Sequence, residues 1–229
     1  MEHEPRYERN RTTITPEEQQ VLASARVCVC GCGGIGGYVI EMLARAGVGT
    51  IVAVDGDAFE ASNLNRQLLA REDNLGCSKA EAARERVGAV NSQVNVVVRN
   101  ELIEDGNAGD ILAGCDLVVD ALDSYQTRLA LEGWCAEREI PLIHGAIAGW
   151  YAQVTAIEPG SHAIERIYPQ STEAGAEKAL GNPSFTPALA ASIEVAEAVK
   201  VLLAKGTPLY GKLLVMDLLR NTQRIIELD

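Results

Sequence analysis

Four glycines in the first part of the chain have a spacing that could hold a phosphate group. Gly31, Gly33 and Gly36 match the pattern G-x-G-x-x-G, and Gly34 lies inside it. The first glycine of such a loop allows a tight turn, the second lets the backbone approach a phosphate, and the third lets a helix pack closely on a strand. Backbone N–H groups at the start of that helix favour an anion. A glycine turn without a ligand would show the same pattern, so the residues around it must decide.

Charged side chains after the glycine loop distinguish between the possible ligands. The run 62–67, Ser-Asn-Leu-Asn-Arg-Gln, contains Arg66, and Lys79 stands at the start of an expected helix, where the dipole disfavours a cation unless an anion faces it. A dinucleotide such as NAD needs neither cation, whereas a triphosphate must be neutralised across several phosphates. Asp123, expected at the carboxyl end of a strand, could hold a Mg²⁺ ion that bridges those phosphates. Each residue alone could be solvated or cap a helix, so only their combination favours ATP.

The elements around these residues have the pattern of a nucleotide-binding fold. Residues 26–30 and 50–54 are expected strands on either side of a helix at 38–46, and the second strand ends at Asp55, whose carboxylate could accept hydrogen bonds from a ribose. This alternation continues and predicts an α/β fold of Rossmann type, a mostly parallel sheet with helices on both faces. Further strands are expected at 94–98, 116–120, 141–144 and 153–157, and further helices at 78–90, 124–137 and 188–205.

The two ends of the chain depart from this alternation. Residues 1–14 carry three arginines and are expected to form a basic arm that reaches out from the body. A capping box at Thr15 begins the first helix, and residues 15–229 are expected to form a single domain. Within it, the segment 159–187 is rich in Gly, Pro, Ser and charge, so we expect a long mobile loop. Antiparallel strands at 213–217 and 222–228 are expected to close the sheet.

Composition limits the possible partners and the compartment. The 229 residues carry 20 Lys and Arg against 32 Asp and Glu, a formal charge of −12, which argues against nucleic acid or an anionic membrane as the main partner. The apolar stretches are too short to span a bilayer, and the charged start does not resemble a secretory leader. The six cysteines lie mostly in apolar runs, so we expect reduced thiols and a cytoplasmic protein.

Several motifs together resemble a known family. The run 62–67 is the most specific, and the match spans about residues 6–153, with the closing helix and hairpin also fitting. The other matching motifs are Arg6-Tyr7-x-Arg9, the glycine loop, Asp55-x-Asp57, Gly76-x-Ser78-Lys79-Ala80, and Asp120-Ala121-x-Asp123 followed by Arg128. On these residues the sequence resembles the ThiF/MoeB/HesA family, relatives of the ubiquitin-activating enzymes.

The resemblance implies an ATP-dependent adenylyltransferase. Its substrate would be the C-terminal Gly-Gly carboxylate of a small ubiquitin-like sulfur-carrier protein, of the thiamine or molybdenum-cofactor type, with Mg²⁺ required and pyrophosphate released. Asp55 would hold the ribose, Asp123 would bind Mg²⁺, and Arg9 would act as an arginine finger from the partner subunit of a homodimer. Asn63, Arg66 and Lys79 would contact the phosphates. The implied catalytic residues are Arg9, Arg66, Lys79 and Asp123, and the implied binding residues are Gly31, Gly33, Gly34, Gly36, Asp55, Asp57, Ser62, Asn63, Asn65, Arg66, Gln67, Lys79 and Asp123.

The cysteines differ from the family pattern. Many relatives bind structural zinc through two Cys-x-x-Cys pairs, but here no cysteine follows Cys135, so we expect no zinc site. The segment 159–187 lacks the cysteine with which some relatives form a thioester, so the sulfur would come from a separate donor protein. Packing is the expected role of Cys77, Cys115 and Cys135.

Two other functions fit part of the sequence. An NAD-dependent oxidoreductase would use the glycines and Asp55 but would leave the cations and Asp123 unexplained. A non-catalytic relative that binds a carrier or a nucleotide would not need the complete set of charged residues. Neither His144 nor His162 has a partner pattern that suggests catalysis. Thiamine and molybdenum-cofactor routes both remain open, and the missing zinc ligands favour a thiamine-type carrier.

Overall fold

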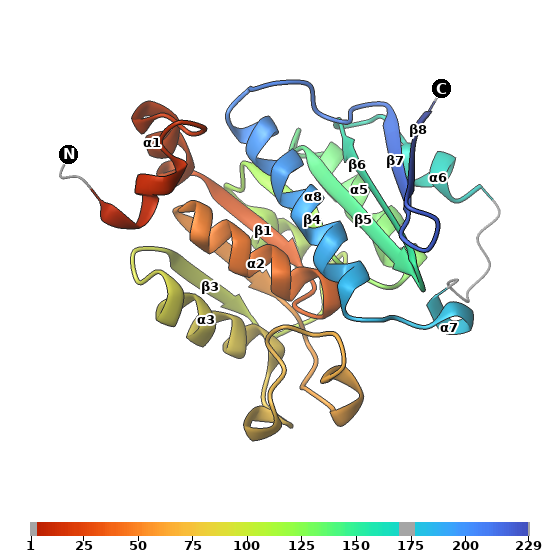
Figure 1. Ribbon diagram of the computed structural model, residues 1–229, viewed down its shortest axis with the longest axis horizontal. Coiled ribbons are helices and arrows are strands. Elements are labelled where there is room, and N and C mark those ends of the chain that lie inside the picture. The colour runs from red at the N-terminus through yellow and green to blue at the C-terminus, as the bar shows by residue number, and fades with distance from the viewer. Residues whose placement is uncertain (1–3, 170–176, 229) are drawn as a thin grey trace.

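The computed structural model describes residues 4–169 and 177–228, and its strands form an eight-stranded sheet (Figure 1). The strand order is β3-β2-β1-β4-β5-β6-β7-β8; β1 to β5 are parallel, and β6, β7 and β8 are added antiparallel. This confirms the predicted α/β fold and its antiparallel closing strands. The strands are β1 (Arg26–Cys30), β2 (Thr50–Val54), β3 (Asn95–Arg99), β4 (Leu117–Asp120), β5 (Leu142–Ala148), β6 (Tyr151–Ile157), β7 (Lys212–Asp217) and β8 (Thr222–Glu227).

Helices cover both faces of the sheet, so the fold has three layers. α2, α3 and α8 pack on one face and α5 packs on the other (Figure 1). The short α4 contributes to the same core as α5. Because strand side chains alternate between faces, Val27 and Val29 of β1 enter the first core while Cys28 and Cys30 enter the second. The helices are α1 (Pro16–Ser24), α2 (Gly34–Ala46), α3 (Lys79–Val90), α4 (Ala108–Leu112), α5 (Tyr125–Ala136), α6 (Ala163–Ile167), α7 (Glu177–Leu180) and α8 (Phe185–Leu202), with short 3-10 turns η1 (Pro5–Asn10), η2 (Ala61–Asn63) and η3 (Glu72–Asn74).

The sheet changes direction at the hairpin of β5 and β6. The two strands pair from Leu142 opposite Ile157 to Ala148 opposite Tyr151, which leaves only two residues for the turn. The first of them is Gly149, whose φ of +57° lies in the left-handed region that glycine adopts without strain. Both strands are therefore longer than the sequence predicted, because their pairing extends up to this turn.

The segment 159–187 contains more regular structure than we predicted. α6 and α7 fall within it, and α8 begins at Phe185 rather than at position 188. Residues 170–176 of this segment lie outside the described residues, so the predicted mobility stays a prediction. Buried α6 side chains such as Ile164 pack on the α5 side of the sheet, a tertiary contact that the local composition does not reveal.

The described part of the N-terminal arm lies against the body instead of reaching out. The Tyr7 hydroxyl accepts a hydrogen bond from Asn91 Nδ2 at 2.8 Å, and Arg6 contacts the Asn91 side-chain oxygen. Both contacts fix η1 near the end of α3, the helix that leads into β3. The prediction of an extended arm is therefore wrong for the residues from position 4 onward.

Five of the six cysteines are buried, and Cys77 is exposed. Cys28 and Cys30 face the same side of β1 with their sulfur atoms 3.7 Å apart, as expected from their spacing in a strand. Packing is thus the role of Cys115 and Cys135, but the same prediction is wrong for Cys77, which lies in the loop before α3. In the described ranges, no helix is both long and apolar enough to cross a membrane.

Candidate active site

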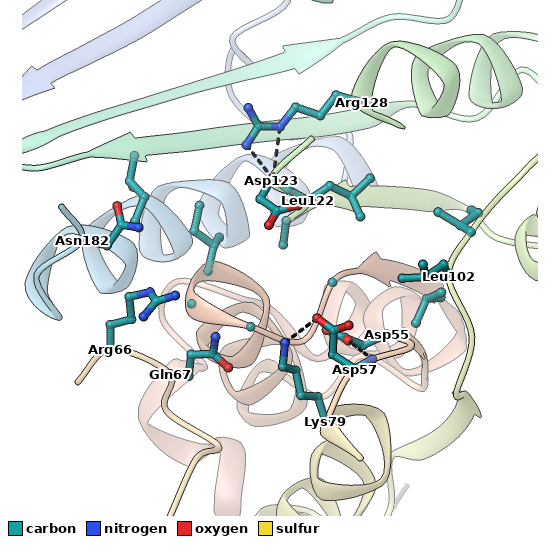
Figure 2. Close-up of a pocket in the computed structure, with 18 of the residues that line it drawn as sticks. Asp55, Asp57, Arg66, Gln67, Lys79, Leu102, Leu122, Asp123, Arg128 and Asn182 are labelled. Atoms are coloured by element: carbon teal, nitrogen blue, oxygen red, sulfur yellow. Dashed lines mark hydrogen bonds and ion pairs between the residues drawn. The ribbon is translucent and has the colours of Figure 1, made fainter. Parts of the chain in front are cut away.

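A cavity of about 350 Å³ opens at the carboxyl ends of β1, β2 and β4 (Figure 2). β1 lies between β2, the next strand in sequence, and β4, which begins the other half of the sheet. The cavity is therefore at the point where the strand order reverses. Open α/β sheets bind their ligands at such a switch point, and this volume lies within the range of small-molecule sites. The cavity brings together most of the predicted site residues: Gly31, Gly33, Gly34, Asp55, Asp57, Arg66, Gln67, Lys79 and Asp123.

The glycine loop forms one wall of this cavity. Gly31 has a φ of +99°, and a Cβ there would lie 2.6 Å from the Ala121 carbonyl oxygen. A Cβ on Gly36 would lie 1.8 Å from the Gly31 carbonyl oxygen, so this glycine lets α2 approach β1. The turn and packing roles that the sequence suggested for the first and third glycines are confirmed. Gly36 acts from behind the loop and does not line the cavity itself.

Acidic side chains and one lysine form the wall at the end of β2. Asp55 accepts hydrogen bonds at 2.8 Å from the backbone N–H groups of Cys32 and Asp57. Burial nevertheless raises the pKa of the Asp55 carboxyl, because desolvation outweighs those hydrogen bonds. Lys79 Nζ lies 2.8 Å from Asp57 Oδ2, and its side chain is only 10% exposed. The ammonium group is therefore held at the cavity rather than solvated.

The polar run 62–67 is a turn that presents Arg66 and Gln67 to the cavity. Arg66 Nη1 donates to the Ser62 carbonyl and to Asn65 Oδ1, both at 3.0 Å. The buried Asn63 accepts from the Glu60 backbone N–H at 3.0 Å. Ser62, Asn63 and Asn65, which the sequence analysis assigned to the binding site, do not line the cavity. Their side chains and carbonyls instead build the turn, because short polar groups satisfy its backbone.

The opposite wall is the loop after β4. Leu122, Asp123 and Arg128 line it, and Figure 2 shows the Arg128 guanidinium next to this loop. Arg128 Nε donates to the Leu122 carbonyl at 3.1 Å, and the Leu122 N–H donates to Asp120 Oδ1 at 2.9 Å. Leu122 is thus held on both sides, which fixes the position of the Asp123 backbone next to it.

The family model described as "ThiF family" matches residues 7–229. The chain belongs to the ThiF family. A SAMP-activating enzyme E1 of Haloferax volcanii is 37% identical over 212 residues, which cover 91% of this chain and 78% of that protein. A sulfur carrier protein adenylyltransferase of Thermus thermophilus is 36% identical over 220 residues, covering 92% and 81%.

A solved structure of the same fold contains a nucleotide. The Escherichia coli tRNA N6-threonylcarbamoyladenosine dehydratase TcdA in complex with ATP has a TM-score of 0.75 and 27% identity to this chain. The alignment covers 87% of this ThiF-family chain and 94% of that protein. The fold similarity therefore extends over nearly the whole TcdA chain.

Arg9 is the predicted catalytic residue that this ThiF-family chain does not bring to its own cavity. It lies exposed in η1, which contacts Asn91 just before β3. This is the amino end of the strands, and the cavity is at their carboxyl end, roughly 15 Å away for a strand of five residues. In the same chain, Arg9 cannot touch a ligand in the cavity.

Ten residues that line the cavity were missing from the predicted site residues: Ile35, Val54, Glu101, Leu102, Ile103, Ala121, Leu122, Arg128, Ile147 and Asn182. Arg128 was part of a recognised motif but had no assigned role. The apolar residues after β3 gave no signal, because a short apolar stretch in a loop has no periodicity. Asn182 lies in the segment predicted as loop, and its carbonyl accepts from Asn65 Nδ2 at 3.0 Å.

Proposed function

We propose that this chain is an adenylyltransferase that uses ATP to activate the C-terminal carboxylate of a small ubiquitin-like sulfur-carrier protein ending in Gly-Gly. The observation that carries the proposal is the placement of Arg66, Lys79 and Arg128 around one glycine-lined cavity together with Asp123 (Figure 2). Three cations in one site suit a triphosphate and exceed what hydride transfer needs. Membership in the ThiF family and the names of its relatives support the same activity.

The reaction needs positioning and charge neutralisation rather than a protein nucleophile. A carboxylate oxygen of the carrier attacks the α-phosphorus of ATP, and the bond from that phosphorus to the α–β bridging oxygen breaks. The products are a carrier acyl-adenylate and pyrophosphate, which carries away the electron pair of the broken bond. Both reactants are anionic, so Arg66 and Lys79 lower the barrier by offsetting their repulsion.

The two ends of the cavity suit the two ends of ATP. Leu102, Ile103 and Leu122 give an apolar surface for the adenine ring, and Asp55 accepts from the ribose hydroxyls. The N–H groups at the start of α2, opened by Gly33 and Gly34, face the phosphates. This orientation places the α-phosphate between the glycine loop and the cations.

The Asp123 carboxylate fits a Mg²⁺ ion held jointly with the phosphates. It is an exposed hard oxygen ligand at the cavity wall, and proteins often bind Mg²⁺ through one or two carboxylates plus substrate phosphates. Across residues 4–169 and 177–228, no cluster of three or more His, Cys, Asp or Glu side chains could hold a metal by itself. When bound, the ion would neutralise charge on the phosphates.

A homodimer would complete the site with Arg9. Since η1 is remote from the cavity of its own chain, Arg9 can serve as an arginine finger only from a partner subunit. We also propose a cytoplasmic location and a separate sulfur donor. The carrier is of thiamine or molybdenum-cofactor type, and the name of the Haloferax relative adds a SAMP protein as a candidate.

ATP–pyrophosphate exchange tests this proposal. We expect labelled pyrophosphate to enter ATP only when a Gly-Gly-ended carrier is added, and Asp123→Asn to abolish exchange while thermal unfolding is unchanged. Mg-ATP should raise the melting temperature, and NAD should not. Failure to see exchange with carriers of all three types, or stabilisation by NAD alone, would contradict the proposed function.

A further inference from the structure

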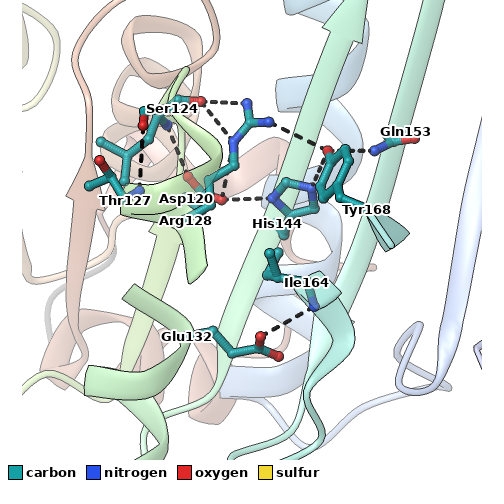
Figure 3. A network of polar contacts seen from close by, with 10 residues as sticks. Asp120, Ser124, Thr127, Arg128, Glu132, His144, Gln153, Ile164 and Tyr168 are labelled. Carbon is teal, nitrogen blue, oxygen red and sulfur yellow. Dashed lines mark hydrogen bonds and ion pairs between the residues drawn. The ribbon is translucent and has the colours of Figure 1, made fainter. Parts of the chain in front are cut away.

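A network of buried and half-buried polar side chains leads from the interior of the sheet to Arg128 at the cavity wall (Figure 3). Asp120 at the end of β4 and His144 in β5 are both fully buried. His144 Nδ1 lies 2.7 Å from Asp120 Oδ2, and His144 Nε2 lies 3.0 Å from the Tyr168 hydroxyl. Tyr168 follows α6, so this hydrogen-bond network joins β4, β5 and the segment after α6, which are distant in sequence.

The Tyr168 hydroxyl contacts three side chains of this network. Gln153 Nε2 donates to it at 2.7 Å and Arg128 Nη1 donates to it at 3.4 Å. With these two donors on the hydroxyl oxygen, the geometry suits a Tyr168 proton directed to His144 Nε2. His144 must then carry its own proton on Nδ1 and donate it to Asp120. The contacts therefore specify a neutral imidazole in one tautomer, and burial lowers the pKa of His144 in agreement with this.

Arg128 connects this hydrogen-bond network to the cavity. Its guanidinium donates twice to the Leu122 carbonyl and once to Tyr168, which uses three of its five N–H groups. The side chain is 13% exposed and lines the cavity. Its Cζ also lies 5.9 Å from the centre of the Tyr168 ring. Tyr168 thus limits the orientations of a long side chain that otherwise has many rotamers.

His144 itself is not placed to act on a substrate. It is fully buried and does not line the cavity. A general acid or base must come within hydrogen-bond reach of the reacting group. The Asp–His–Tyr arrangement therefore acts through Arg128 rather than on the reactants.

We propose that Asp120, His144 and Tyr168 are positioning residues that aim the Arg128 guanidinium at an anionic phosphate in the cavity. The inference rests on the proposed function for the identity of the anion. It predicts that the Tyr168 hydroxyl contributes to ATP use only while Arg128 is present.

A double-mutant cycle tests this dependence. Tyr168→Phe keeps the ring and removes the hydroxyl, and we expect it to lower kcat/KM for ATP in the exchange assay about tenfold, the usual scale for a hydrogen bond to a charged group. Arg128→Lys keeps the charge but loses the fork geometry. In the Arg128→Lys background, Tyr168→Phe should change kcat/KM less than twofold, because contacting residues are coupled.

The matched control is Tyr125→Phe. The Tyr125 ring packs edge-on against the Tyr168 ring, with centroids 5.9 Å apart, so this variant probes the same aromatic cluster. It should leave kcat/KM within twofold in both backgrounds. An additive cycle for Tyr168→Phe, or equal losses for the two Tyr→Phe variants, would overturn the inference.

Imidazole ¹⁵N NMR gives a second readout that needs no nucleotide. The chain has only three histidines, and the variants His3→Gln and His162→Gln assign the signals. We expect His144 to be the Nδ1–H tautomer at pH 7.5, and Tyr168→Phe to shift its Nε2 resonance. An Nε2–H tautomer or an imidazolium would overturn the proposed hydrogen-bond network. If the wild type shows no exchange, the proposed function fails. The spectrum then still tests whether Asp120, His144 and Tyr168 form the proposed hydrogen-bond network.

Discussion

At the scale of single residues, Lys79 shows how a locally unfavourable position is offset by its surroundings. It is the first residue of α3, where the helix dipole disfavours a cation. Asp57 Oδ2 lies 2.8 Å from its Nζ, and the Asp57 side chain is 64% exposed. The pair therefore holds the ammonium at the cavity without a large contribution to stability, since partly exposed ion pairs contribute little.

We expect Lys79→Met to weaken Mg-ATP binding tenfold or more while the melting temperature changes by only a few degrees. The reason is the loss of a cation that faces phosphate in a largely desolvated position. Isothermal titration calorimetry with Mg-ATP measures the effect. Lys205→Met, which removes a lysine paired with Glu18 far from the cavity, is the matched control and should bind Mg-ATP normally. Equal weakening in both variants would count against a phosphate contact by Lys79.

Glu194 is a buried acid that the proposed reaction does not use. It is fully buried in α8, and both of its carboxyl oxygens are without a hydrogen-bond partner among the described residues. Desolvation, with Asp120 nearby, raises the pKa of Glu194 well above its usual value, although Arg128 acts in the opposite direction. Burial therefore favours the protonated carboxyl of Glu194 in the folded protein more than in the unfolded chain.

Stability should depend on pH through this residue. Glu194 ionises in the unfolded chain above pH about 4.3 but loses its proton only at a higher pH in the folded chain, so its contribution to stability is lost as pH rises from there toward the folded pKa. Glu194→Gln removes this loss. Urea unfolding at pH 5, 6 and 7 should show the variant gaining on the wild type by up to about 1.4 kcal/mol per pH unit. A difference that is independent of pH would contradict a raised pKa.

At the scale of elements, the close contact of α2 with β1 is possible because Gly36 has no side chain. Gly36→Ala would force a Cβ to within 1.8 Å of the Gly31 carbonyl oxygen. We expect a loss of roughly 3 kcal/mol or more in the free energy of unfolding, because backbone must move to relieve the overlap. Gly88→Ala in α3, where nothing lies within 4 Å of the new Cβ, should instead stabilise by about 0.5–1 kcal/mol. Denaturant unfolding distinguishes these effects, and similar values for both would refute the packing argument.

The segment 159–187 shows why some elements could not be predicted. α6 is five residues long, too short for a periodic signal, and it is held from outside by Glu132 of α5. That carboxylate accepts from the Ala163 and Ile164 N–H groups at 2.6 and 3.2 Å. Long elements such as α2 were predicted because their own apolar pattern specifies them, whereas α6 depends on a partner 31 residues away.

At the scale of the whole molecule, the two ends of the sheet separate Arg9 from the cavity. Mixing the Arg9→Ala variant with the Asp123→Asn variant tests whether Arg9 of one subunit reaches the cavity of its partner. Each variant alone should be inactive in exchange. A mixed dimer contains one complete site, so equal mixing and random reassociation should restore about a quarter of wild-type activity. No restoration, or an active Arg9→Ala protein, would exclude catalysis by Arg9 of the partner.

The sequence alone determined the alternation of strands and helices, the glycine turn and the charged residues that follow it, because these features depend on local periodicity, backbone freedom and residue type. Only the tertiary structure decided which of them share a cavity. It placed Arg128 there, left Asn63 and Asn65 in the supporting turn, and gave His144 two partners that its neighbours in sequence do not suggest. The physical reason is that hydrogen-bond partners in a sheet come from adjacent strands and covering helices, and strand order is set by packing of the whole chain.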